Sequence, residues 1–424
     1  MKNDLRIPLI VTCLLVLALS SCQNSAQDNS QEQPAAPLQQ IELTQPQEAA
    51  LGNSQVAFSI QLLQQACQAA PQGNVCLSPI GVANQLSLIA NGTQGETRSQ
   101  MLRALQVDSI AQSNAYHSLF MSRNSQDTTV SMANMVVLQP TFKVLPVFNQ
   151  IAQEQYRSTV RVLSGNTAKD VARINQWCAK HTKGMIPDVA VEDMLQQSAM
   201  VLLNAVSFDA EWVHKFESWD ETYTFHTPTQ NVKADELSDS FNARYCQPTD
   251  KAGKALPFKT LCLDYAGEKY EMMIVLPRKG ITADSLLPLL TPDLLRKCSE
   301  VKRQLVYLQM PKVDMSDEVP VKNLLQSMGI TKAFDRSGSA SDFSLLSTTP
   351  TYISDIRQKV ALKIDEDGTK AAAVTITEVC ISVIDEEPPE PIEFIVNRPY
   401  LLFLREKSHG TILFAARIND PTAQ

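Results

Sequence analysis

The side chains of this 424-residue chain that could do chemistry do not form a recognised catalytic motif. The patterns of a serine nucleophile elbow (G-x-S-x-G), a zinc protease helix (H-E-x-x-H), a dinucleotide-binding turn (G-x-G-x-x-G) and a phosphate-binding loop (G-x-x-x-x-G-K-[ST]) are all absent. The five histidines, which we expect to have surface or capping roles, are His117, His181, His214, His226 and His409. The sequence therefore predicts a protein that is not an enzyme and that needs no cofactor or metal.

Nine cysteines are the other reactive side chains, and Cys13 and Cys22 belong to the N-terminal leader described below. The remaining seven, an odd number, are Cys67, Cys76, Cys178, Cys246, Cys262, Cys298 and Cys380. In an exported protein, Cys67 with Cys76 and Cys246 with Cys262 are close enough in sequence to be considered as disulfides. Buried free thiols are the alternative. Because no C-x-x-C spacing occurs, a zinc or thioredoxin-like site is not indicated.

The most unusual segment runs from Asp365 to Pro399. After an acidic turn, residues 369–377 read T-K-A-A-A-V-T-I-T, and the period of two of a strand places only Thr and Ala on one face. Such a strand could slide into a crowded sheet without a clash. The acidic, proline-rich run 385–391 should be exposed and extended, because proline cannot donate to a sheet ladder and clustered charges resist burial. An ordinary edge strand followed by a loose loop is the alternative.

The N-terminus has the features of an export signal. Lys2 and Arg6 precede an apolar run at 7–19, and Leu-Ser-Ser-Cys follows at 19–22. This resembles the lipobox of bacterial lipoproteins, which implies cleavage before Cys22, acylation of Cys22 and anchoring to a bacterial membrane. The protein would then face the periplasm or the cell exterior, and the leaflet stays open. A plain secretory peptide or a short buried helix is the alternative, and the run is too short to span a bilayer comfortably.

The rest of the chain divides into a tether and one large domain. We expect residues 1–21 to be a lipoprotein signal peptide, 22–50 a flexible tether rich in Gln, Ser, Pro and Ala, and 51–424 a single folded domain. The net charge of -8 gives a nucleic-acid partner no electrostatic support. No basic helix suggests activation by heparin-like polymers.

Periodicity predicts an α+β fold, with helices mainly in the first half and strands mainly in the second. The predicted helices cover 58–69, 78–90 and 170–181. The predicted strands cover 135–138, 200–208, 271–276, 305–310, 360–364 and 401–404.

Seven elements in chain order resemble the serpin family, and the resemblance covers essentially all of residues 51–420. They are N-V-C-L-S-P at 74–79, T-K-G-M-I-P at 182–187, L-N-A-V-S-F at 203–208 with Trp212 and Phe216, M-M-I-V-L-P at 272–277, L-Q-M-P-K at 308–312, D-E-D-G-T-K-A-A-A-V-T at 365–375 and N-R-P-Y-L-L-F at 397–403. The resemblance implies a serpin fold of three β-sheets and about nine helices with an exposed reactive-centre loop at about 366–392. It also implies a monomeric suicide inhibitor: the target protease forms a covalent acyl-enzyme with the loop, which inserts into the central sheet as a new strand.

The resemblance also assigns site residues. The hinge of the loop would comprise Glu366, Gly368, Thr369, Ala371, Ala372 and Ala373. The region that controls sheet opening would include Ser78, Asn204, Trp212, Lys312 and Gln358. Gln358 departs from the family, because many members have His there, but an amide can still form hydrogen bonds. Lys370 also departs, on the face that we expect to point to solvent.

The resemblance implies a reactive bond roughly seventeen residues from Glu366 inclusive, as in inhibitory members of the family, which places it between Ser382 and Val383. The neighbouring candidates are Val379, Cys380, Ile381 and Ile384. No Lys or Arg lies between Lys370 and Arg398, so a trypsin-like target is disfavoured. The sequence favours elastase-like or subtilisin-like serine proteases, with papain-like cysteine proteases as an open possibility. A serpin-fold surface protein that binds without inhibiting is the alternative function, and the physiological target stays open.

Overall fold

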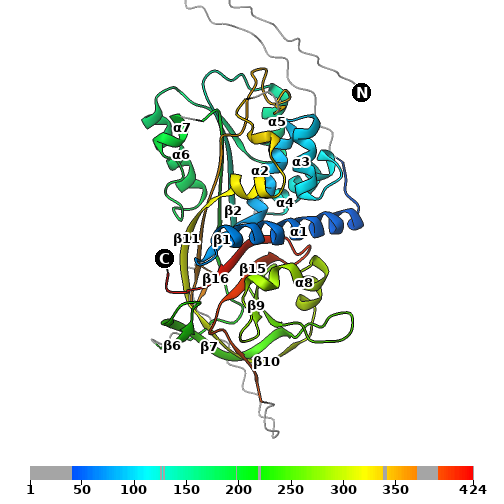
Figure 1. The fold of residues 1–424 in the computed structure, drawn as a ribbon, viewed down its shortest axis with the longest axis vertical. Coiled ribbons are helices and arrows are strands. Elements are labelled where there is room, and N and C mark those ends of the chain that lie inside the picture. Colours follow the sequence, from blue (N-terminus) through cyan, green and yellow to red (C-terminus); the bar gives the residue numbers. More distant parts are fainter. Residues whose placement is uncertain are drawn as a thin grey trace, which may run out of the picture. The chain divides into compact units, whose positions relative to one another are not determined.

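The computed structural model describes residues 41–423, except 125, 126, 128, 197, 218–220, 338–340 and 370–389. The helices in this part are α1 (Gln45–Ala69), α2 (Pro79–Asn91), α3 (Gly95–Leu105), α4 (Ile110–Arg123), α5 (Pro146–Glu154), α6 (Thr167–His181), α7 (Glu192–Gln196), α8 (Pro292–Ser299) and α9 (Val321–Ser327). Two 3-10 helices cover Asp284–Leu289 and Lys332–Phe334. In Figure 1, α2 to α5 gather at one end of the body, and α1 lies between them and β15 and β16.

One sheet has seven strands in the order β3-β2-β4-β12-β13-β5, and β11 pairs with β12 off this path. The bounds are β2 (Val130–Leu138), β3 (Thr159–Val162), β4 (Met200–Phe208), β5 (Ala210–Glu211), β11 (Val313–Pro320), β12 (Asp355–Ile364) and β13 (Gly368–Thr369). Every residue of β4 is buried, as expected for a central strand covered on both faces.

A nine-stranded sheet has the order β1-β16-β15-β9-β8-β7-β10-β14, and β6 pairs with β7. The bounds are β1 (Val75–Leu77), β6 (Thr222–His226), β7 (Asn231–Cys246), β8 (Phe258–Asp264), β9 (Tyr270–Pro277), β10 (Arg303–Pro311), β14 (Ile392–Ile395), β15 (Tyr400–Glu406) and β16 (Ile412–Ile418). The 16-residue strand β7 pairs with β6, β10 and β8 in turn, so it merges two of the three expected sheets into one hydrogen-bonded network.

One expectation needs correction. The predicted tether reaches residue 50, but α1 already begins at Gln45, where the Thr44 backbone N–H donates to Gln47 Oε1 at 2.9 Å and Pro46 occupies the first turn. The six cysteines of the described part are all free, and five of them are buried, which agrees with the alternative of buried free thiols that the sequence left open beside the two disulfides. The expected leader, lipidation site and most of the tether lie outside the described residues.

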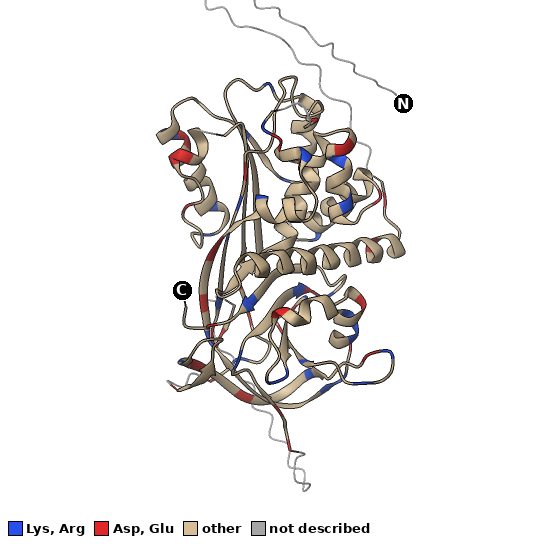
Figure 2. Ribbon diagram, viewed as in Figure 1, with Lys and Arg blue, Asp and Glu red and all other residues tan. Residues whose placement is uncertain are grey.

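Acidic and basic residues are interspersed along the elements (Figure 2), and many of them pair across neighbouring elements. Within the described residues, no helix combines the length and the apolarity that a bilayer crossing requires.

Candidate functional site

A parallel seam between β4 and β12 runs through the middle of the seven-stranded sheet. The two strands pair directly from Val201 opposite Asp355 to Val206 opposite Val360. Beyond this stretch, β13 pairs with β12 on one side and with β5 on the other. The chain that leads into residues 370–389 therefore starts as a short strand between the continuations of β4 and β12.

Gly368 and Thr369 form that short strand. Gly368 lies opposite Glu211, and a Cβ at this position would come within 2.1 Å of the Ala210 carbonyl oxygen, so glycine is required here. Thr369 is buried, and its hydroxyl shares a 2.6 Å hydrogen bond with the hydroxyl of Tyr265. The hinge residues that the structure describes are thus packed tightly into the sheet.

Trp212 holds the turn before the hinge in place. Its backbone N–H donates to the Asp367 carbonyl at 2.9 Å, and its indole N–H donates to the Asp365 carbonyl at 3.0 Å. The indole stacks on Tyr265 with ring centroids 4.4 Å apart. The backbone N–H of Phe216 donates to the Glu366 carbonyl at 3.0 Å. The turn 365–367 therefore rests on a buried aromatic support.

Lys312 of the predicted sheet-opening region and Glu366 of the predicted hinge form an ion pair. Lys312 precedes β11, and its Nζ lies 2.9 Å from Glu366 Oε2. Both side chains are about one quarter exposed, at 27% and 28%, so we expect a modest contribution to stability. Lys215 makes a parallel link, with its Nζ 3.0 Å from Glu211 and 3.4 Å from Asp367.

A row of amide side chains crosses the seam. Asn134 of β2, Asn204 of β4 and Gln358 of β12 lie directly opposite one another in register. The Asn204 amide donates to Asn134 Oδ1 at 2.7 Å, and the Gln358 amide donates to Asn204 Oδ1 at 2.6 Å. Parting β4 from β12 must break this second bond.

The start of α2 closes the row from one side. The Ser78 backbone N–H donates to Gln358 Oε1 at 2.8 Å, and the Gln358 amide donates to the Ser78 carbonyl at 2.9 Å. The Ser78 hydroxyl donates to the Leu413 carbonyl of β16 at 2.6 Å, which links the seam to the second sheet. A Cβ on Gly81 would come within 2.3 Å of Asn204 Oδ1, so glycine allows α2 to approach this closely.

The row continues to residues that the sequence did not identify. Asn134 donates to Asn84 Oδ1 at 2.8 Å, and the Asn84 amide lies 3.4 Å from His117 Nδ1. His117 is only 3% exposed, and burial lowers its pKa to about 3. The expected surface role of His117 is therefore wrong. Its spacing from Ser113 and Phe120 on one buried helix face was the available signal.

The structure thus brings together Ser78, Asn204 and Gln358 at the seam, and Glu366, Gly368, Thr369, Trp212 and Lys312 at the hinge. The remaining predicted residues, Ala371, Ala372, Ala373, Val379, Cys380, Ile381, Ser382, Val383 and Ile384, lie outside the described residues. After this gap the chain resumes at Glu390 and enters β14, which pairs in parallel with β10 of the nine-stranded sheet. Residues 370–389 therefore connect the two sheets.

The chain thus passes from the short strand β13, beside the seam of one sheet, through residues 370–389 to β14 in the other sheet. Residues 53–421 match the family model described as "Serpin (serine protease inhibitor)", and the chain belongs to the serpin family. It is similar to Serpin I2 of Homo sapiens, with 26% identity over 87% of this chain and 91% of the relative. It is also similar to the leukocyte elastase inhibitor of Xenopus tropicalis, with 27% identity over 86% and 97%.

The fold is also that of known serpin structures. The solved thyroxine-binding globulin complex with thyroxine superposes with a TM-score of 0.77 and 21% identity, and the match covers 88% of this chain and 100% of that one. The expectation of a mixed α+β serpin fold is confirmed.

Proposed function

We propose that the protein is an inhibitory serpin whose loop, once cleaved by a protease, inserts between β4 and β12. The observation that carries this proposal is the position of β13. Gly368 and Thr369 already lie between β12 and β5, so the hinge needs no rearrangement to begin a new central strand. The small side chains of the face that starts at Thr369 and continues through Ala371 and Ala373 support insertion into a tightly packed sheet.

The energetics also favour insertion. Parting the seam breaks the backbone pairing between 201–206 and 355–360, together with the Gln358–Asn204 hydrogen bond. An inserted strand replaces that pairing and adds on the order of ten ladder hydrogen bonds, at roughly 0.5–1.5 kcal/mol each. The intact protein is then kinetically trapped, because the seam must open before the gain is realised. If the cleaved loop inserts while it is still joined to the protease as an acyl-enzyme, it displaces and inactivates the protease.

The loop sequence favours particular targets. With the reactive bond at Ser382–Val383, the residues from Val379 to Ile384 are all small or apolar. Such a loop fits the binding sites of elastase-like and subtilisin-like serine proteases. The name of the similar leukocyte elastase inhibitor of Xenopus tropicalis is consistent with this choice. Papain-like cysteine proteases, which also form acyl-enzymes, are a second class to test.

We also propose that the inhibitor is held at a bacterial membrane through an acylated Cys22. The residues between Cys22 and the start of α1 at Gln45 would form the tether. Their composition supports this role, because a segment with so few large apolar residues buries too little apolar surface to offset the entropy lost on ordering. The proposed anchor would confine inhibition to proteases that reach the cell surface.

The direct test is to mix the protein with a neutrophil-type elastase, a subtilisin and a papain-like enzyme. Denaturing gels and mass spectrometry then follow the products. A complex that survives denaturation, with a released C-terminal peptide that begins near Val383, is the expected result. Cleavage in the loop by all three enzymes without any such complex would support the alternative of a serpin-fold protein that does not inhibit.

A further inference from the structure

A cavity lies where the parallel seam begins, at the end of β12 that is far from the hinge. Its volume is about 320 Å³, which falls within the usual range of small-molecule sites, about 300–1,000 Å³. Met194 and Ser198, which precede β4, line one side, and Ser354 and Arg357 at the start of β12 line another. A molecule bound in this cavity would therefore contact the chain on both sides of the seam.

Ser354 joins the two strands at this point. Its backbone N–H donates to the Met200 carbonyl at 2.9 Å, and its hydroxyl accepts a 2.8 Å bond from the Ala199 backbone N–H. Its carbonyl accepts a 2.8 Å bond from Nζ of Lys322 on α9, which also lines the cavity. Parting β4 from β12 at this end must break the first two bonds, beside the Lys322 ammonium.

Two cations of the lining, Lys322 and Arg336, are available to a ligand. The Lys322 ammonium has three N–H donors, and it gives one of them to Ser354. Arg336 is exposed at the rim. In the part of the chain that the structure describes, no carboxylate pairs with either side chain.

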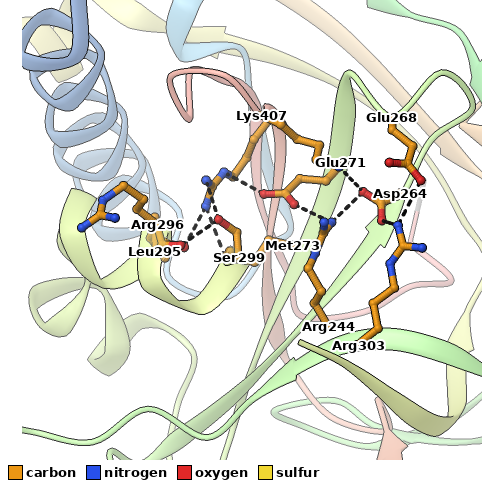
Figure 3. A network of polar contacts seen from close by, with 11 residues as sticks. Arg244, Asp264, Glu268, Glu271, Met273, Leu295, Arg296, Ser299, Arg303 and Lys407 are labelled. Carbon is orange, nitrogen blue, oxygen red and sulfur yellow. Dashed lines mark hydrogen bonds and ion pairs between the residues drawn. The ribbon is translucent and has the colours of Figure 1, made fainter. Parts of the chain in front are cut away.

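The charge network of β7, β8 and β9 shows the opposite arrangement (Figure 3). Arg244 lies 2.6 Å from Asp264 and 2.8 Å from Glu271, and Arg303 lies 2.8 Å from Asp264. The carboxylates that surround these arginines already satisfy their charge. The cavity at the start of the seam instead offers positive charge to an incoming molecule.

The carboxylates of the cavity oppose this charge only in part. Asp355 accepts a 2.6 Å bond from Arg357 Nε and a 2.9 Å bond from the Ile356 backbone N–H, so both of its oxygens are engaged. Arg357 also pairs with Glu318. Asp193 is exposed and forms no ion pair within the described residues. Asp193 should therefore weaken the binding of an anion without preventing it.

We propose that this cavity binds a phosphate group, free or carried by a small soluble ester, with Lys322 and Arg336 as its cationic contacts. A phosphate monoester carries between one and two negative charges at pH 7, which matches these two cations. Its oxygens accept charge-assisted hydrogen bonds from ammonium and guanidinium groups. The bound group would hold the starts of β4 and β12 together and so slow the opening of the seam. Only the effect of that delay on inhibition rests on the proposed function.

Calorimetric titration of the full chain with inorganic phosphate, at an ionic strength held constant with NaCl, tests the site. We expect one site with a dissociation constant below about 1 mM. Lys322→Gln and Arg336→Gln should each weaken binding about tenfold, because each removes one charge-assisted hydrogen bond. Lys254→Gln makes the same charge change at an exposed position elsewhere and should have no effect, whereas Asp193→Asn should tighten binding.

The same titration with glycerol 3-phosphate distinguishes the two sources of the group. Tighter binding than that of inorganic phosphate assigns the remaining space to an organic moiety, and equal or weaker binding assigns the site to free phosphate. Absence of binding by both probes, or an equal loss of affinity in Lys254→Gln and Arg336→Gln, would overturn the proposal. Because Arg336 is exposed, Arg336→Gln should fold even if Lys322→Gln does not.

Hydrogen exchange at the backbone amides of 200–206 and 355–360 tests the effect on the seam. At a phosphate concentration ten times the dissociation constant, exchange at these amides should slow about tenfold, because opening competes with binding. Arg336→Gln at the same concentration should show less than a threefold change. Unchanged exchange in the phosphate-bound wild type would contradict the link to the seam. No protease enters these measurements, so their outcome is independent of whether the protein inhibits one.

Discussion

Gln358 is the side chain that joins the two strands of the seam to each other and to α2. Its amide group makes three hydrogen bonds, to Asn204 and to both backbone groups of Ser78. Its position in register with Asn204 explains how a residue other than His can serve there, because the amide supplies a donor and an acceptor at the same point.

Gln358→Ala should therefore shorten the lifetime of the intact inhibitor. The substitution leaves the Ser78 N–H and Asn204 Oδ1 without their partner in a buried site, which costs about 1–3 kcal/mol per group. These hydrogen bonds stabilise the closed seam and are broken in the transition state in which β4 and β12 part. Without them, spontaneous loss of inhibitory activity at 37 °C should become about tenfold faster. Gln304→Ala, at an exposed position of β10, is the control. Equal lifetimes for the Gln358 variant and the wild type would contradict this role.

His117 should make the stability of the intact protein depend on pH. Its pKa is lowered by burial from 6.5 to about 3 in the folded protein, so the unfolded chain binds more protons in between. Stability is thus fully present above pH 6.5 and is lost as the pH falls toward 3. Between pH 7.5 and pH 5 the loss should be about 2 kcal/mol.

Urea unfolding of the intact protein at the two pH values measures this loss. His117→Gln should reduce the difference between the midpoints, whereas His226→Gln, at an exposed position, should leave it unchanged. An undiminished pH dependence in His117→Gln would show that other groups cause it.

The residues at the β4–β12 seam could be predicted only where the resemblance to the serpin family assigned them. Ser78 and Asn204 lie in matched family elements, and Gln358 was assigned by its position in the family, where many members have His. The structure does bring the three together. Asn84 and Asn134 were not predicted, because a polar residue inside an apolar run reads as an interruption. Their partners come from elements that are distant in sequence, and no local pattern contains that information.

At the scale of elements, the hinge depends on which face of the inserting strand is small. Thr369 is buried against Tyr265. In an inserted strand the period of two would place Ala371 on the same face as Thr369 and Ala372 on the opposite face. Ala371→Arg should convert the inhibitor into a substrate, because a buried guanidinium without a partner opposes insertion.

Ala372→Arg is the matched control for this change, with the same charge and size one residue away. The fraction of protease captured in denaturation-resistant complexes, measured against the fraction of loop cleaved, should fall at least tenfold for Ala371→Arg and stay near the wild-type value for Ala372→Arg. Equal effects of both variants would mean that the loop does not insert with this register.

Element boundaries show the limits of pattern reading in a different way. The strand 200–208 was predicted with its observed bounds, because the run is apolar throughout and buried on both faces. The start of α1 was placed too late, because the mostly polar sequence at 44–50, with a proline at position 46, suggested a tether. Those same residues form a capped and mostly exposed first turn, in which polarity and Pro46 are compatible with a helix.

At the scale of the whole molecule, the proposed anchor should decide where the inhibitor is found. Cys22→Ser should move the protein from the detergent phase to the aqueous phase in a phase-partition experiment on bacterial cells, because the acyl chains would be lost. Cys13→Ser, which changes another cysteine of the proposed leader, should keep the protein in the detergent phase. Detergent partitioning that persists in Cys22→Ser would rule out lipidation at this residue.

The most direct test of the whole account is the thermal stability of the protein before and after a single cleavage in the loop. Loop insertion adds a central strand between β4 and β12, so the cleaved protein should melt at least about 10 °C above the intact one. Cleavage between Val379 and Ile384 that leaves the melting temperature unchanged would mean that the loop stays outside the sheet, and the proposed mechanism of inhibition would be wrong.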